Sequence, residues 1–216
     1  MIRAAVGESR TLLNVGAGAG SYEPDDMHVT AVEPSASMRK ARLALGRPPA
    51  INATAQSLPF DDDSFDTALA SITIHHWNDL AGGLRELRRV TRGAILILTF
   101  DPELLGCFWN IEYFRELVEV ERQRYPNMQT LADCLPADEI SAKPVPVPLD
   151  CTDGFQEAFY GRPEAFLDPA VRKSQSAWGF LRPGAEERLV ANFKGELDSG
   201  AWDQKHGHYR TQPELI

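Results

Sequence analysis

The chain is short of cysteine, of positive charge and of long apolar runs. Its three cysteines are odd in number and far apart, which fits neither a disulfide framework nor a metal site. Lysine and arginine total 22 against 31 aspartates and glutamates, and the net charge of −9 argues against binding a nucleic-acid backbone. No apolar run reaches about 18 residues, and no signal-peptide pattern opens the chain. We therefore expect a cytoplasmic protein with no metal and no membrane or nucleic-acid partner.

Apolar runs alternate with helix-like stretches through the first half of the chain. Runs that are apolar throughout and are separated by helices are typical of a parallel sheet covered on both faces. The predicted fold is therefore α/β, with a doubly wound, mostly parallel sheet. The predicted strands are residues 11–15, 29–33, 50–54, 65–72 and 94–100.

Two segments between these strands carry helix signals. Residues 38–45 contain helix formers, and the segment Pro34-Ser35-Ala36-Ser37 offers an N-cap just before them. A second helix is predicted over residues 80–90, because apolar side chains recur there four, three and three residues apart. These side chains are Leu80, Leu84, Leu87 and Val90.

The character of the chain changes after Asp101. Aromatic residues gather between residues 108 and 180, and we interpret them first as a core and second as a lid over an apolar acceptor. Proline stands at every second position of residues 143–149, which indicates an edge strand or an extended segment. Helices are predicted at residues 111–124 and 185–197.

Three glycines alternate directly after the first predicted strand, at Gly16, Gly18 and Gly20, and Glu33 ends the second. A buried strand, a glycine turn and a terminal carboxylate are the parts of a βαβ unit that binds a nucleotide or nucleoside. The carboxylate of such a unit accepts hydrogen bonds from both ribose hydroxyls. For the glycines alone, a tight loop without a ligand is the alternative.

The link between Gly20 and Glu33 narrows the ligand class. Only twelve residues separate the two, Pro24 lies among them, and they show no amphipathic period, so a full helix does not fit. A pyrophosphate would lose much of the helix N-terminus that normally holds it. Ser21 also stands where the dinucleotide pattern has Gly or Ala. The link therefore favours a phosphate-free cofactor over a dinucleotide.

With these features the chain resembles the class I S-adenosylmethionine-dependent methyltransferases. Within them it resembles the small-molecule group called type 11, or ubiquinone/menaquinone-biosynthesis-like. The resemblance covers residues 11–101, and its five pieces stand in the family's order. The matching pieces are residues 13–20, 31–35, 55–66, 71–77 and 86–93.

The resemblance implies a Rossmann-like methyltransferase fold, S-adenosylmethionine as the cofactor and a small organic molecule as the methyl acceptor. It places residues 1–101 in the cofactor-binding half of the domain. Residues 102–216 would then hold an α-rich insertion or lid after strand five and the carboxyl-terminal part of the same domain. The residues that it implies for cofactor binding are Asn14, Gly16, Ala17, Gly18, Glu33, Pro34, Met38, Ala55, Gln56, Ser71 and Ile72.

The chain departs from the family at several positions. Asn14 stands where the family commonly has Asp, and Thr54-Ala55-Gln56 stands where it commonly has Asp-Ala-Glu, so both changes remove charge. The first helix is shortened, and only about ten residues precede the first strand. Residues 209–216 show no clear seventh strand.

Methyl transfer demands alignment of nucleophile, methyl group and sulfur above all. A general base is needed only where the acceptor arrives protonated. His75 and His76 are the base candidates, and the resemblance favours His76 as the catalytic residue, with loop packing as the alternative for both. His206 and His208 are expected at the surface.

The predicted function is S-adenosylmethionine-dependent methylation of a small organic molecule at O, N or C, by a monomer or homodimer. A non-catalytic or degenerate S-adenosylmethionine-binding protein is one alternative. A NAD-type oxidoreductase is the other and is less favoured.

Overall fold

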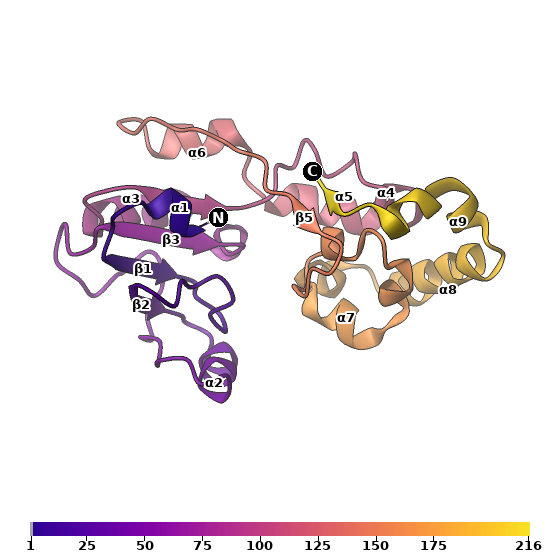
Figure 1. Cartoon of the computed structure of the whole chain (residues 1–216), viewed down its shortest axis with the longest axis horizontal. Helices are drawn as coiled ribbons and strands as arrows, with labels where there is room; N and C mark the ends of the chain where they lie inside the picture. The colour runs from indigo at the N-terminus through magenta and orange to yellow at the C-terminus, as the bar shows by residue number, and fades with distance from the viewer. Residues whose placement is uncertain (1) are drawn as a thin grey trace. The chain divides into compact units, whose positions relative to one another are not determined.

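Four short apolar segments form one parallel sheet in a computed structural model of the chain, which describes residues 2–216. The strand order is β2-β1-β3-β4, so β1 and β3 occupy the two central positions (Figure 1). In each of the two central strands all but one residue are buried, as expected for strands covered on both faces. The strands are β1 (Thr11–Val15), β2 (His28–Val32), β3 (Thr67–Ser71) and β4 (Ile95–Leu98).

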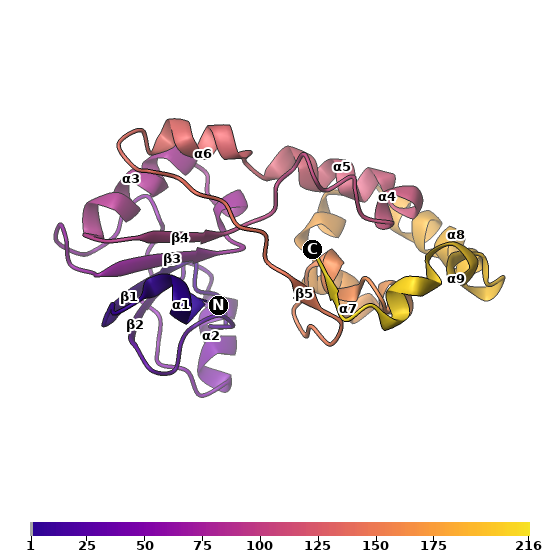
Figure 2. The same cartoon turned by 45° about the horizontal axis from the view of Figure 1, so that its top comes forward.

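Helices cover both faces of this sheet. The first helix, α1, packs through Val6 against Leu12 and Leu69, and α3 lies on the opposite face in both views (Figures 1 and 2). The predicted doubly wound α/β fold is therefore confirmed. The helices of this part are α1 (Ile2–Val6), α2 (Ala36–Ala44), η1 (Ile74–His76), α3 (Leu80–Val90) and α6 (Met128–Cys134).

Two side-chain caps fix where the sheet-flanking helices begin. The Ser35 hydroxyl accepts the Met38 N–H at 3.4 Å at the start of α2. A carboxylate oxygen of Asp79 accepts the Gly82 N–H at 2.8 Å at the start of α3. Both caps satisfy backbone donors that have no partner inside the helix. The sequence predicted a cap within residues 34–37, which the structure places at Ser35, and it predicted the bounds of α3.

Asp66 links the beginnings of β1 and β3. Its carboxylate accepts the N–H groups of Arg10 and Thr11, at 3.0 Å each, and binds the Arg92 guanidinium at 2.7 Å. These bonds, led by those from Thr11 and Arg10, hold the pKa of Asp66 far below its usual range. An aspartate inside the otherwise apolar run at residues 65–72 is explained by this junction.

Residues 50–54 do not form the predicted strand. Ile51 alone makes a parallel bridge, to Val32. Two consecutive prolines just before this segment supply no N–H, and Thr54 turns back to bridge to Ser57. The ladder therefore stops after one residue pair.

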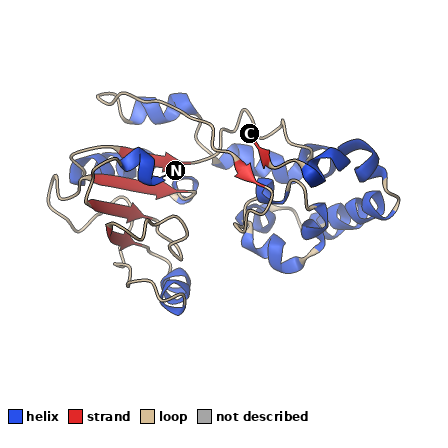
Figure 3. Ribbon diagram, in the orientation of Figure 1, coloured by secondary structure: helices blue, strands red, loops and turns tan. Residues whose placement is uncertain are grey.

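The chain divides into two compact units. Unit 1 contains the sheet and consists of the chain up to Asp101 together with Tyr125–Asp138. Unit 2 consists of Pro102–Arg124 and Glu139–Ile216 and is mostly helical (Figure 3). The interpretation of residues 102–216 as an insertion and lid stays a prediction.

Unit 2 is built around aromatic side chains. Phe114, Phe166 and Trp202 are each fully buried, and the Trp109 and Phe193 rings stack 5.5 Å apart. The interpretation of the aromatic residues as core is confirmed for these side chains. The helices of unit 2 are α4 (Asn110–Tyr113), α5 (Arg115–Arg124), η2 (Gln156–Phe159), η3 (Pro163–Leu167), α7 (Pro169–Ser174), η4 (Ser176–Phe180), α8 (Ala185–Asp198), α9 (Ala201–His206) and η5 (Gly207–Thr211).

A two-stranded antiparallel ribbon closes unit 2. It pairs β5 (Val147–Pro148) with β6 (Glu214–Leu215), so the proline-rich segment is extended as predicted. The sequence indicated no clear seventh strand at residues 209–216, and the two residues of β6 pair with β5 in this separate ribbon rather than with the main sheet. Backbone pairing alone makes the ribbon, and an alternating side-chain pattern cannot show in two residues. No helix within residues 2–216 is long and apolar enough to cross a membrane.

Candidate functional site

The glycine turn after β1 is held by backbone hydrogen bonds to β2. The N–H groups of Gly16 and Ala17 both donate to the Val32 carbonyl, at 2.9 and 3.0 Å. Gly16 has φ +70°, and a Cβ at this position would lie 2.0 Å from the Thr73 hydroxyl oxygen. Both the left-handed backbone and the contact with Thr73 therefore require glycine here.

Glu33 fastens the turn from the other side. Its buried carboxylate accepts the Gly18 N–H at 2.8 Å and the Ser35 N–H at 2.7 Å. An ionised carboxylate offers about four acceptor positions, so about two remain for donors from a ligand. Two neighbouring hydroxyls, as on a ribose, match that remaining capacity.

The carboxyl end of β3 is strained and carries a buried polar atom. Ile72 has φ +48°, although it is β-branched, and its N–H donates to the Leu98 carbonyl at 2.8 Å. A β-branched residue in this region is an outlier of the kind that gathers at functional sites. Within residues 2–216 the buried hydroxyl of Ser71 has no hydrogen-bond partner, and neither has the side-chain oxygen of Asn14.

These features lie at the carboxyl ends of parallel strands, where open α/β sheets bind their ligands. The Met38 side chain lies across the glycine turn, since a Cβ on Gly18 would come 3.3 Å from its terminal methyl carbon. Met38 is 40% exposed and Pro34 is also exposed, so both can flank a flat group at the mouth of the site.

Three further predicted residues lie along the segment that leads into α3. The Gln56 amide donates to the Asp79 carbonyl at 3.2 Å, and Ala55 packs beside Gly83. His76 is exposed, and its ring lies 3.9 Å from the ring of His75. The predicted residues with these contacts therefore fall into two groups. One group lies around the glycine turn, and the other lies around the start of α3.

Sequence reasoning missed three residues of the site. Thr73 packs on Gly16, and Glu23 and Arg42 form a buried ion pair behind the turn, with two N···O distances of 2.7 and 2.8 Å. Thr73 belongs to the matching piece at residues 71–77, which was the available signal. A single Glu in a loop and a single Arg in a helix carry no such signal.

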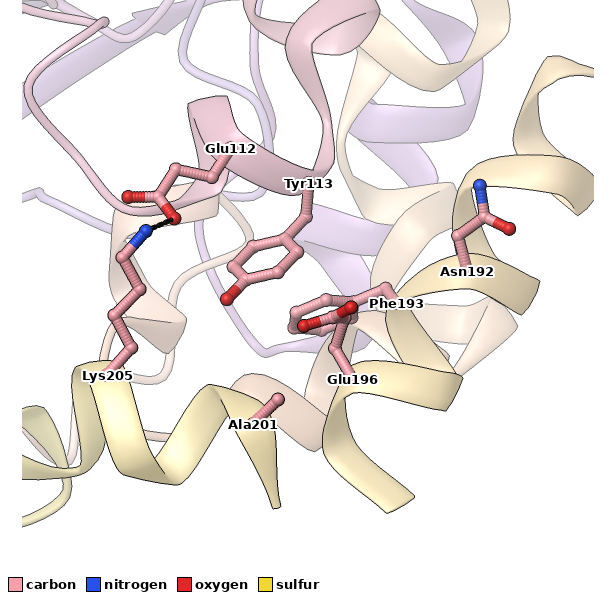
Figure 4. A pocket seen from close by; sticks show the side chains of 7 residues that line it. All are labelled: Glu112, Tyr113, Asn192, Phe193, Glu196, Ala201 and Lys205. Carbon is pink, nitrogen blue, oxygen red and sulfur yellow. Dashed lines mark hydrogen bonds and ion pairs between the residues drawn. The ribbon is translucent and has the colours of Figure 1, made fainter. Parts of the chain in front are cut away.

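A hollow lies within unit 2 and has a volume of about 570 Å³ (Figure 4). The Tyr113 and Phe193 rings form part of its wall, and an ion pair joins Glu112 to Lys205 at its side. Burial, followed by the charges of Glu112 and Glu196, raises the pKa of Tyr113. None of the predicted site residues lines this hollow.

The position of His206, which follows the lining residue Lys205 in the sequence, differs from the expectation. It was expected at the surface, but it is buried, with its Nε2 3.4 Å from a carboxylate oxygen of Glu112. Its ring packs near Trp202 and Tyr113 in the aromatic core. Among residues 2–216, no group of three or more His, Cys, Asp or Glu is placed to hold a metal ion.

The fold and the glycine turn together define a nucleoside-binding α/β domain. The turn offers left-handed glycines and a buried carboxylate with free acceptor capacity. Near the carboxyl ends of β1 and β3, two buried side-chain oxygens have no hydrogen-bond partner within residues 2–216. No helix follows the turn before β2 to take a pyrophosphate. The residues therefore fit a nucleoside cofactor without phosphates.

Comparisons with known proteins agree with this class. Residues 13–98 match a family described as a methyltransferase domain. A crystal structure from Anabaena variabilis, assigned to a methyltransferase of an antibiotic biosynthesis pathway, is 28% identical, with a TM-score of 0.86 over 97% of this chain and 87% of that chain. An S-adenosylmethionine-dependent methyltransferase from Thermotoga maritima is 27% identical, with a TM-score of 0.52 over 63% of this chain and 66% of that one.

A curated relative is the malonyl-[acyl-carrier protein] O-methyltransferase of Halorhodospira halophila, 35% identical over 108 residues. The match covers 44% of this chain and 37% of that enzyme, so the chain spans well under half of the relative's length. The match to the methyltransferase domain family covers residues 13–98, which is under half of the chain. The predicted family and its cofactor, S-adenosylmethionine, are thus confirmed.

Proposed function

We propose that the chain is an S-adenosylmethionine-dependent methyltransferase that methylates a small organic molecule at O, N or C. The observation that carries the proposal is the Glu33 carboxylate, which closes the glycine turn by accepting the Gly18 N–H and keeps acceptor capacity for two hydroxyls. The match of residues 13–98 to the methyltransferase domain family supports it.

In the proposed reaction the chain mainly binds the cofactor and the acceptor and orients them for methyl transfer. The cofactor, when bound, supplies a methyl group on a positively charged sulfur. Glu33 would hold the ribose hydroxyls, the Gly16–Gly18 turn would line the amino-acid part, and Met38 would flank the adenine. Alignment of this kind supplies much of the acceleration of a displacement.

The bonds balance without a redox partner. The acceptor atom uses a lone pair to form the new bond to carbon, and the carbon–sulfur bond breaks to leave a neutral thioether. Where the acceptor arrives protonated, His76 would take the proton; its exposed imidazole next to His75 supports that role.

Isothermal titration calorimetry with three ligands tests the proposal. Binding of both S-adenosylmethionine and S-adenosylhomocysteine, with no binding of NAD, is the expected result. Binding of NAD alone would overturn the proposal.

Catalysis needs a separate assay. Incubation with methyl-labelled S-adenosylmethionine and a mixture of small hydroxyl, amine and carboxyl compounds should label a product. Binding of the cofactor without transfer to any acceptor would favour a non-catalytic binding protein.

A further inference from the structure

Behind the glycine turn lies a buried polar network that joins three segments of unit 1. Arg42 on α2 and Glu23 in the β1–β2 link pair through both guanidinium nitrogens and both carboxylate oxygens, at 2.7 and 2.8 Å. Their side chains are only 1% and 2% exposed. Asn14 of β1 donates its amide N–H to the same carboxylate at 2.8 Å.

The network touches the turn itself. Gly20 has φ +91°, and a Cβ there would lie 2.7 Å from a guanidinium nitrogen of Arg42. The Arg42 Nε also donates to the Pro48 carbonyl, which fixes the guanidinium from its other side. Since Met38 of the same helix packs over Gly18, α2 contacts the turn at two points one helical turn apart.

The charges of this network allow only one carboxylate. Arg42 supplies one positive charge, and Glu23 already takes both of its terminal nitrogens. A carboxylate in place of the Asn14 amide would face a Glu23 oxygen at hydrogen-bond distance with no proton between them, and within residues 2–216 the cation paired with Glu23 is Arg42. Buried like charges at this separation are strongly unfavourable.

The structure assigns Glu23 and Arg42 as positioning residues that hold the glycine turn against α2, with Asn14 required to be neutral because Glu23 carries the charge. Neither Glu23 nor Arg42 needs to touch the cofactor for this role, so the inference goes beyond the proposed function. The part of its test that measures cofactor binding rests on that function. This assignment also explains why position 14 holds the neutral asparagine where the family commonly has a charged aspartate.

A double-mutant cycle tests the assignment. The variants are Asn14→Asp, Glu23→Gln and the two together, which moves the single carboxylate from the link to the strand. Two quantities are measured at a temperature where circular dichroism shows each variant folded. They are the dissociation constant for S-adenosylhomocysteine and the amide hydrogen exchange of Gly18 and Gly20 in the cofactor-free protein.

Each single variant should raise the dissociation constant and the exchange rates by about tenfold, in the middle of the range for coupled buried groups. The double variant should return both to within about threefold of wild type, because the network again holds one carboxylate and one guanidinium. Asn14→Asp keeps the Glu23–Arg42 pair and covers the case in which Glu23→Gln does not fold.

Asp25→Asn is the matched control, because Asp25 lies in the same link as Glu23 and pairs with Arg47 at 2.7 Å but is 86% exposed. It should change neither quantity. Folded single variants with unchanged turn exchange would overturn the assignment, as would a double variant whose losses simply add. Wild-type protein that does not bind S-adenosylhomocysteine would instead overturn the proposed function, and the exchange measurements would then decide the assignment alone.

Discussion

Replacing Glu33 with alanine is the most direct test of the candidate site. The substitution removes the carboxylate that accepts the N–H groups of Gly18 and Ser35 and, in the proposed complex, two ribose hydroxyls. Hydrogen bonds to a charged group contribute about 1.5–3 kcal/mol. The two ribose bonds share one carboxylate with two backbone donors, so we expect a combined loss of about 1.5–3 kcal/mol rather than twice that.

A loss of this size weakens binding about 10- to 150-fold. The assay is calorimetric titration with S-adenosylhomocysteine, at a temperature where the variant is folded. Glu8→Ala is the matched control, since Glu8 is an exposed glutamate of the same unit, and it should leave the dissociation constant unchanged.

Adenosine and 2′,3′-dideoxyadenosine separate the ribose contact from a general loosening of the turn. Wild-type protein should prefer adenosine, and Glu33→Ala should lose most of that preference. Unchanged affinity for S-adenosylhomocysteine in the folded variant would refute the reasoning. An equal loss for both nucleosides would show that Glu33 only shapes the turn.

Three further predictions concern the turn, a titrating carboxyl group and the aromatic core. Gly16→Ala should abolish cofactor binding and lower the thermal midpoint, because the new Cβ would overlap Thr73. Burial raises the pKa of Glu157 from 4.5 to about 7. The unfolding free energy should therefore rise as the pH falls from 8 towards 5, by about 1–3 kcal/mol, and chemical denaturation of Glu157→Gln should show this rise removed. Phe166→Ala should cost about 3–5 kcal/mol in the same assay, because Phe166 is fully buried among the rings of unit 2, whereas Phe180→Ala, at a ring 64% exposed, should cost far less.

The sequence predicted those parts of the fold that depend on local patterns. The bounds of α3 follow from the spacing of Leu80, Leu84, Leu87 and Val90, and all but the first of these four are buried. The absence of a helix between β1 and β2 follows from twelve residues that hold Pro24 and no amphipathic period. Both features are decided by neighbours in the chain, which is why one sequence sufficed.

Features decided by distant residues escaped prediction. The pairing of Glu23 with Arg42 joins residues nineteen positions apart, and Thr73 reaches Gly16 because β3 pairs directly with β1. The burial of His206 depends in the same way on the aromatic core around it. Local patterns carry no record of such contacts, so the sequence named candidate positions for the ligand but not the residues that hold those positions in place.

Ile72 gives this fold a built-in conflict between thermostability and binding. A non-glycine residue in the left-handed region costs about 1–3 kcal/mol, and Ile72 holds such a φ, +48°, at the carboxyl end of β3. Selection for heat resistance alone should therefore favour Ile72→Gly, which adopts this backbone without strain. If ligand binding needs this strained backbone, the Ile72→Gly protein will bind S-adenosylhomocysteine less tightly. A library sorted for both heat resistance and binding will then keep isoleucine at this position.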